Sequence, residues 1–338
     1  MICFCYCCLI YIIVLEEYRV NSNVLVTGGL GHIGSALIRY LAELSDIDQI
    51  TIMDNLVTQR YASLFNLPDN ISYRFVEGDV MQDEDMDEAL RDIDVIVHLA
   101  AITDAEGSFD RSEDVNLINF EGTQKVIEAC IRNGVRRLIF PSTTSVYGPV
   151  SGIALENSRR SDLRPQSPYA VSKLDAEDEI LKYTKSGNIE GVLLRLGTIF
   201  GPSPGMRFHT AVNKFIFHAV TTKPLTVWEE AVNLVRPYLD LKDAVRVIGF
   251  MITNTQCIGE IYNVVTLNAT LDQIIESIRL NIEDIEIEYT STRMLNQVSY
   301  HVNDDKLRSI GFEYCGDLTT GVRDTCDILR GIYCNNVP

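Results

Sequence analysis

The stretch from residue 23 to residue 35 reads NVLVTGGLGHIGS, an apolar run followed by four glycines in seven residues. Glycine costs backbone entropy in a regular element, so such a cluster indicates a tight turn or a close approach of the backbone to another group. The pattern predicts a strand over 24–26 and a helix over 33–44. The glycine loop then lies at a helix N-terminus, where free N–H groups and the helix dipole favour an anion such as a pyrophosphate.

The spacing around this loop is that of a dinucleotide site. From Gly29 the residues read G-x-G-x-x-G, and Asp54 closes the next apolar strand, QITIMD, twenty positions after Gly34. A carboxylate in that place accepts hydrogen bonds from the adenosine ribose hydroxyls and repels a 2′-phosphate. The sequence therefore predicts NAD as cofactor.

The composition of the chain limits the classes of partner that it can bind. The chain has 338 residues and a formal net charge of −18, enough length for one large or two modest domains. Because affinity for nucleic acid comes from a surface rich in Lys and Arg, we expect no nucleic-acid partner. Any phosphorylated ligand must meet a local cluster of basic side chains.

The N-terminal segment is unusual. Residues 1–15 are apolar and contain Cys3, Cys5, Cys7 and Cys8, but the run is shorter than the roughly 20 residues that span a bilayer and has no basic start. We interpret residues 1–21 as an apolar tail and expect no membrane contact unless through residues 1–15. The alternatives are an extra strand-like leader or a start codon placed too early. Cys5 and Cys8 have C-x-x-C spacing, but no second such pair follows in the sequence, so no metal is expected. The remaining five cysteines are those expected of reduced thiols in a cytoplasmic chain.

Downstream, short apolar strands alternate with amphipathic helical stretches, which is typical of a doubly wound parallel α/β sheet of the Rossmann type. We predict an NAD-binding domain over 22–195 and a smaller α/β part over 196–338 that mainly binds substrate and is partly interleaved with the first. Ligands usually bind in the cleft between two such parts.

A second informative stretch is SPYAVSK, residues 167–173. Ser167 and Pro168 suit a helix start, so Tyr169 and Lys173, four residues apart, share one helix face. An ammonium beside a phenol favours the phenolate and lowers its pKa from about 10. Tyr169 is thus a candidate general base, although Tyr and Lys at this spacing also occur as exposed surface pairs.

Hydroxyl side chains gather in FPSTTSVYG, directly after an apolar strand over 137–140. At the C-terminal end of a parallel strand they point into the ligand crevice. Singly, Ser142, Thr143, Thr144 and Ser145 are turn formers. Together with Tyr169 they supply a donor that orients a substrate hydroxyl.

With these motifs, TGGLGHIGS, DNL, GDV, HLAA, STTSVYG and YAVSK, the chain resembles the extended short-chain dehydrogenase/reductases, specifically the NAD-dependent epimerase/dehydratase group that acts on nucleotide sugars. The resemblance implies Thr143, Tyr169 and Lys173 as the catalytic residues. It implies cofactor contacts from Gly28, Gly31, His32, Ile33, Gly34, Asp54, Asn55, Asp79, Val80, Leu99, Ala100, Ala101, Asn119, Tyr169 and Lys173. It also implies substrate contacts from Thr103, Thr143, Thr198, Arg207, Lys214, Trp228 and Arg236, and a homodimer.

Departures from the family pattern narrow the reaction. In the dehydratases and decarboxylases of the family an acid precedes the VYG triplet, but Ser145 stands there in this chain. Elimination and decarboxylation then lack a group that moves a proton. Thr198 replaces a usual asparagine, and WEEAVNLV replaces a glycine-rich GDG before Arg236. Both changes lie in the substrate half.

These features predict an NAD-dependent nucleotide-sugar epimerase, inverting C4 of a UDP-sugar through a transient 4-keto sugar. The alternatives are a keto-sugar reductase or 4,6-dehydratase of the same family. From a different class, a catalytically silent NAD-binding regulator remains open, since fold alone does not establish activity.

Overall fold

The computed structural model describes residues 22–150, 152–291 and 299–332. The predicted tail over 1–21, with Cys3, Cys5, Cys7 and Cys8, lies outside the described residues, as does Cys334. Cys130, Cys257, Cys315 and Cys326 are free thiols. Among the described helices, none combines the length and apolar character that crossing a bilayer requires.

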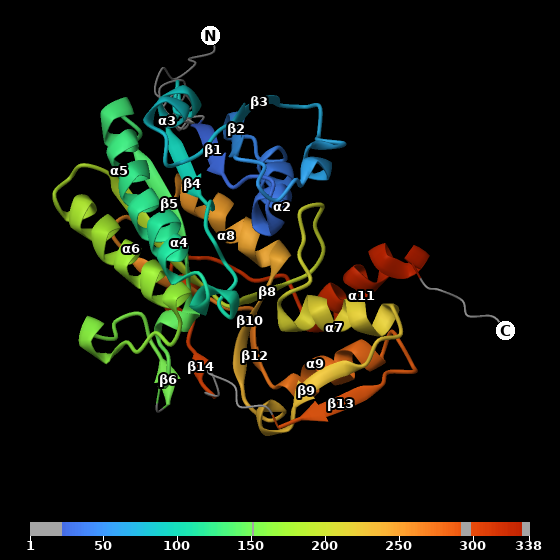
Figure 1. Ribbon diagram of the computed structural model, residues 1–338. Helices are drawn as coiled ribbons and strands as arrows, with labels where there is room; N and C mark the ends of the chain where they lie inside the picture. The colour runs from blue at the N-terminus through green and yellow to red at the C-terminus, as the bar shows by residue number, and fades with distance from the viewer. Residues whose placement is uncertain (1–21, 151, 292–298, 333–338) are drawn as a thin grey trace, which may run out of the picture.

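The centre of the molecule is a seven-stranded sheet in the order β11-β7-β5-β4-β1-β2-β3 (Figure 1). Every neighbouring pair is parallel. The strands are β1 (Ser22–Thr27), β2 (Ile47–Asp54), β3 (Ser72–Glu77), β4 (Val95–His98), β5 (Arg137–Thr143), β7 (Glu190–Leu196) and β11 (Ile261–Val264). Strands covered on both faces are mostly apolar, and all seven residues of β5 are buried, including the polar Arg137, Ser142 and Thr143.

Helices cover both faces of this sheet, which confirms the predicted doubly wound fold (Figure 1). On one face, helices α2 (His32–Leu41) and α8 (Leu241–Thr253) pack on side chains such as Val24 and Ile52. On the other face, α3 (Asp83–Ala89), α5 (Gly122–Asn133) and α6 (Pro168–Lys185) pack on Leu25 and Phe140. The alternation of side chains along each strand supplies both cores.

The remaining elements form a smaller part beside the carboxyl end of the sheet (Figure 1). It holds a three-stranded sheet, β12-β10-β8, and the pair β13-β9. Its elements are β8 (Thr198–Phe200), α7 (Ala211–Val220), β9 (Leu225–Trp228), β10 (Arg236–Asp240), β12 (Leu267–Ala269), α9 (Leu271–Arg279), β13 (Ile287–Thr290) and α11 (Leu318–Leu329). The short elements α4 (Ser112–Asn116), β6 (Ile153–Ala154), β14 (His301–Val302) and α10 (Asp305–Ser309) complete the described chain. Strand β11 and helix α8 follow this part's first strands in sequence but join the large sheet.

Of the element boundaries that differ from the sequence prediction, two lie near the glycine loop and the hydroxyl run. Helix α2 ends at Leu41, three residues earlier than expected. Strand β5 extends to Thr143 instead of ending at Phe140, because its ladder with β7 continues through the pair Thr143 and Leu196. The first two hydroxyl residues of the STTS run therefore belong to the strand and are fixed by the sheet.

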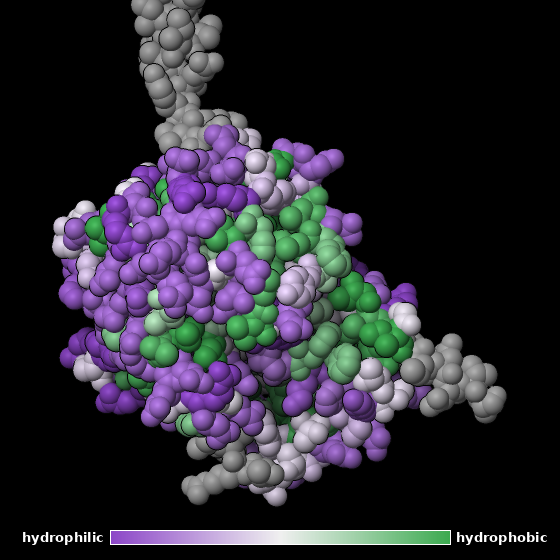
Figure 2. Space-filling model, turned by 45° about the horizontal axis from the view of Figure 1, so that its top comes forward, coloured by the Kyte–Doolittle hydropathy of each residue, from purple (hydrophilic) through white to green (hydrophobic). Residues whose placement is uncertain are grey.

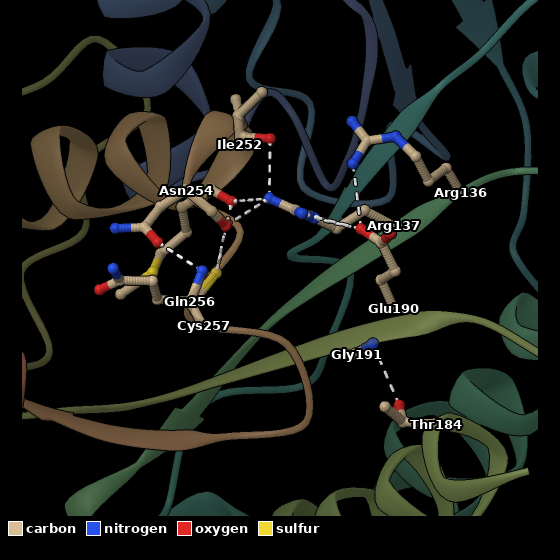
Figure 3. Close-up of polar contacts among 10 residues, drawn as sticks. Arg136, Arg137, Thr184, Glu190, Gly191, Ile252, Asn254, Gln256 and Cys257 are labelled. Atoms are coloured by element: carbon tan, nitrogen blue, oxygen red, sulfur yellow. Dashed lines mark hydrogen bonds and ion pairs between the residues drawn. The ribbon is translucent and has the colours of Figure 1, made fainter. Parts of the chain in front are cut away.

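A buried arginine ties α8 to the sheet (Figure 3). Arg137, fully buried at the start of β5, donates hydrogen bonds to the carbonyl oxygens of Met251, Ile252 and Asn254 at 2.7–2.9 Å and to Glu190 at 2.8 Å. The last carbonyl groups of a helix have no partner within the helix. One guanidinium thus satisfies the end of α8 and fixes that helix against β5 and β7.

The surface of the molecule combines polar and apolar regions. Figure 2 shows a face covered mostly by hydrophilic residues, interrupted by a band of apolar ones. Exposed apolar side chains of the described chain include Val57, Tyr61 and Phe65, which follow β2.

A buried acid at the start of α8 makes stability depend on pH. Burial, assisted by nearby Asp243, raises the pKa of Asp240 to about 6. The folded protein therefore binds this proton more tightly than the unfolded chain, so the stabilisation is complete below pH 4 and is lost as pH rises to about 6. We expect Asp240→Asn, which keeps the acceptor that caps Lys242, to be more stable at pH 7 by about 1–3 kcal/mol. Thermal unfolding of both proteins from pH 4 to pH 8 tests this; a difference that does not grow between pH 4 and 6 contradicts it.

Candidate active site

The glycine loop between β1 and α2 is shaped by close backbone packing. Gly28 has a positive φ of 63°, and a Cβ there would lie 2.8 Å from the backbone nitrogen of Ala100. A Cβ at Gly34 would lie 2.6 Å from the carbonyl oxygen of Gly28. At Gly31, which precedes the first residue of α2, the nearest atoms would be 3.2 and 3.9 Å away. Gly28 and Gly34 thus let the chain fold tightly, while His32 and Ile33 open the helix whose N-terminus suits an anion.

The predicted ribose and adenine contacts lie together at the ends of β2 and β3. The Asp54 carboxylate accepts hydrogen bonds from the backbone nitrogens of Leu30 (3.1 Å) and Leu56 (3.0 Å), so it is attached to the glycine loop itself. Asn55 donates to Asp79 at 3.4 Å. Val80, beside Asp79, is buried in the core. The sequence motifs are brought to one edge because β2 and β3 are neighbours in parallel register.

The segment after β4 lies against the glycine loop. The backbone nitrogens of Leu99 and Ala100 bond to Thr27 at 3.1 and 3.3 Å, and Ala101 follows. Buried Asn119, in a π-helical turn over Leu117–Glu121, holds both the nitrogen and the oxygen of Ile102 and donates to Ser172 on α6. Asn119 therefore connects this segment to the helix of Tyr169; π-helical turns recur at functional sites.

Helix α6 positions the predicted base as expected. Ser167 caps it by accepting from the nitrogen of Ala170 at 3.2 Å, and Pro168 occupies its first turn. Tyr169 lies next to Thr143, and their hydrogen bond joins α6 to the end of β5. Lys173 is buried one turn further, with its Nζ 4.1 Å from the centroid of the Phe140 ring.

The pKa values correct one expectation. Burial raises the pKa of Tyr169 to about 12; Thr143 and the positive charge of Arg207 act in the opposite direction. Burial lowers the pKa of Lys173 to about 7, opposed by Glu177. The positive charge of Arg207 thus favours the Tyr169 phenolate, an effect that the sequence interpretation assigned to Lys173.

Sequence reasoning missed a buried polar network behind these residues. Arg195 on β7 pairs with Glu177 on α6 at 2.6 Å, and Ser142 on β5 donates to Glu177 at 2.5 Å. All three are 3% exposed or less. Ser142, grouped above with the possible substrate donors, is thus engaged in the protein interior.

Only some of the residues predicted to bind substrate contact one another or the catalytic residues. Arg236, at the start of β10, stacks on Tyr300 at 5.8 Å, and both line a small cavity with Ser145 and Gln166. Thr198 begins β8, which pairs with β10. Arg207 donates to Thr103. Lys214 is exposed on α7 and Trp228 half-buried at the end of β9, and within the described ranges no hydrogen bond or ion pair connects either to Tyr169. Tyr300 was not predicted, since no local motif marks it.

The sequence that carries this loop, acid, hydroxyl, tyrosine and lysine matches a known family over most of its length. The sequence profile of the NAD-dependent epimerase/dehydratase family matches residues 24–264. The chain belongs to this family. The cofactor of the NAD-dependent epimerase/dehydratases is NAD, as predicted, and the glycine cradle with Asp54 fits a dinucleotide.

Comparison with individual proteins gives relatives that match most of the chain. The chain is 30% identical over 317 residues to the trifunctional UDP-glucose 4,6-dehydratase/UDP-4-keto-6-deoxy-D-glucose 3,5-epimerase/UDP-4-keto-L-rhamnose-reductase RHM2 of Arabidopsis thaliana, covering 90% of this chain and 47% of the plant enzyme. It therefore spans about half the length of that enzyme. It is 31% identical to the low-salt glycan biosynthesis protein Agl12 of Haloferax volcanii, covering 91% of this chain and 99% of that protein.

A solved structure extends the likeness to three dimensions. The UDP-glucuronic acid 4-epimerase of Bacillus cereus, in complex with UDP-glucuronic acid and NAD, superposes with a TM-score of 0.80. It is 26% identical, and the match covers 92% of this chain and 100% of the bacterial one. In sequence and fold the chain is thus similar to proteins whose names place them on nucleotide sugars. Among its described residues, no group of three or more potential metal ligands occurs.

Proposed function

We propose that the protein inverts C4 of a UDP-sugar by NAD-dependent epimerisation. The observation that carries this proposal is Ser145, which stands where dehydratases of the family place an acid. Ser145 lines a cavity with Gly148, Gln166, Ser167, Ala170, Arg236 and Tyr300, and no carboxylate is among these residues. Elimination of water needs a group that moves a proton at the neighbouring carbon. C4 inversion needs only the base, the orienting hydroxyl and the cofactor.

Each catalytic side chain has a distinct task in this proposal. Bound NAD supplies a nicotinamide ring able to accept and return a hydride. Tyr169 takes the proton from the sugar 4-hydroxyl, and Thr143, hydrogen-bonded to Tyr169, orients the same oxygen. Because burial disfavours the phenolate, nearby positive charge must favour it; Arg207 does so. Lys173, buried on the same helix face, binds next to the cofactor ribose.

A second candidate, sugar 4,6-dehydration, has one observation in its favour. The plant relative carries a 4,6-dehydratase activity in its name. A silent regulator has less support, because Thr143, Tyr169 and Lys173 are all present and the first two are in contact.

Incubation of the purified protein with UDP-glucose, UDP-N-acetylglucosamine and UDP-glucuronic acid separates these candidates. We expect one of them to reach an equilibrium mixture of C4 epimers by NMR, with unchanged mass and without accumulation of NADH. A product lighter by one water would identify a dehydratase and refute the role given to Ser145. NAD binding without turnover of any nucleotide sugar would favour the regulator.

A further inference from the structure

Two half-buried arginines from distant parts of the chain lie beside the glycine loop. Arg60 follows β2, and a Cβ on Gly31 would lie 3.9 Å from its Nη1 atom. Arg207 belongs to the segment over 201–209 that joins β8 to α7, which we call the strap. Burial and the positive charge of Arg207 lower the pKa of Arg60, and burial and both positive charges lower the pKa of His32, the first residue of α2.

The strap is seated on the glycine loop by specific contacts. The backbone nitrogen of Gly205 donates to Ser35 at 2.9 Å, and the His32 ring bonds to the carbonyl oxygen of Gly201 at 2.9 Å. A Cβ on Gly205 would lie 2.2 Å from the carbonyl oxygen of Leu30. Only glycine allows this approach, so the strap brings Arg207 to the mouth of the dinucleotide loop.

Neither guanidinium is neutralised by a direct acid partner. Among the described residues, Arg60 makes no side-chain hydrogen bond or ion pair. Arg207 donates to Thr103, while its Nε atom is buried and unpaired. Asp54 and Asp104 influence the two arginines without an ion pair to either. His32 stays neutral at pH 7, because burial first and these arginines next lower its pKa to about 4.

We propose that Arg60 and Arg207 together bind the diphosphate of the dinucleotide, so that the strap closes over the cofactor. Guanidinium groups form strong paired hydrogen bonds with phosphate oxygens. A diphosphate on the N–H groups of the glycine loop would meet two positive charges that have no ion pair with an acid. In a chain with a net charge of −18, this pair is the local basic cluster that a phosphorylated ligand requires. Arg207, predicted above to contact the substrate, is then a cofactor residue.

The variants Arg60→Gln and Arg207→Gln test the proposal in the full-length protein. Arg91→Gln is the control, because Arg91 is exposed after α3 and its guanidinium makes no hydrogen bond or ion pair among the described residues. Equilibrium dialysis with labelled NAD, ADP-ribose and adenosine gives the affinities. Loss of a charge-assisted contact is expected to weaken NAD and ADP-ribose by about ten- to a hundred-fold. Adenosine affinity should not change, and the salt dependence of NAD binding should decrease.

Two results would overturn the proposal. One is unchanged NAD affinity in either variant, since both arginines are assigned to the same diphosphate. The other is weaker binding of UDP to the NAD-saturated protein with NAD affinity preserved. That result would assign Arg207 to substrate binding, as the sequence analysis predicted. Unfolding midpoints within the range of Arg91→Gln exclude misfolding as the cause. These measurements need no turnover, so they are independent of the proposed epimerisation.

Discussion

Replacing Tyr169 by phenylalanine is expected to lower turnover of the preferred UDP-sugar by about 10²–10⁴-fold, the usual contribution of a general acid or base. The substitution removes one hydroxyl and keeps the ring that packs at the start of α6. The hydrogen bond with Thr143 is lost. The glycine loop and Asp54 are untouched, so NAD should remain bound. Epimer formation followed by NMR, with NAD content measured in the same samples, provides the test.

Tyr183→Phe on the same helix is the matched control. Tyr183 is half-buried, and its hydroxyl makes no hydrogen bond among the described residues, so removing it should change neither turnover nor NAD content. Turnover of Tyr169→Phe within a factor of about three of wild type would contradict a base at this position. It would direct attention to Thr143 or to a group of the substrate itself.

The parts of the site that the sequence predicts are those carried by short continuous motifs. Each of these motifs lies at the end of a strand or the start of a helix: the glycine loop from Gly28 to Gly34, Asp54, and Tyr169 with Lys173. The spacing of apolar residues locates such boundaries. Parallel topology then brings the strand ends to one edge of the sheet.

Contacts between distant segments could not be predicted in this way. Tyr300 meets Arg236 across 64 positions of sequence, and Gly205 meets Leu30 across 175. Neither residue has a motif of its own, and a glycine in a loop does not say which backbone it approaches. The sequence also could not predict that the pKa of Tyr169 is raised. Burial outweighs the neighbouring charges, and burial follows from the assembled fold.

The buried pair behind the catalytic helix leads to the second large prediction. Arg195→Met is expected to lower the free energy of unfolding by about 3–5 kcal/mol, since it leaves the Glu177 carboxylate without its counter-charge in the protein interior. Ser142 alone would still donate to that carboxylate. Glu177→Leu should be comparably destabilising, because Arg195 is 2% exposed and already has one buried nitrogen, Nη1, without a hydrogen-bond partner.

The double variant Glu177→Leu/Arg195→Met distinguishes a charge effect from a packing effect. Removing both charges avoids an isolated buried ion, and such replacements are often neutral or stabilising. We therefore expect the double variant to be more stable than either single one, as measured by urea unfolding with the slope compared between variants. If the two single losses simply add, the cost comes from lost packing and the pair contributes no coupling. Because α6, β5 and β7 meet at this pair, recovery of stability would show that each single loss comes from an unpaired buried charge between the catalytic helix and the sheet.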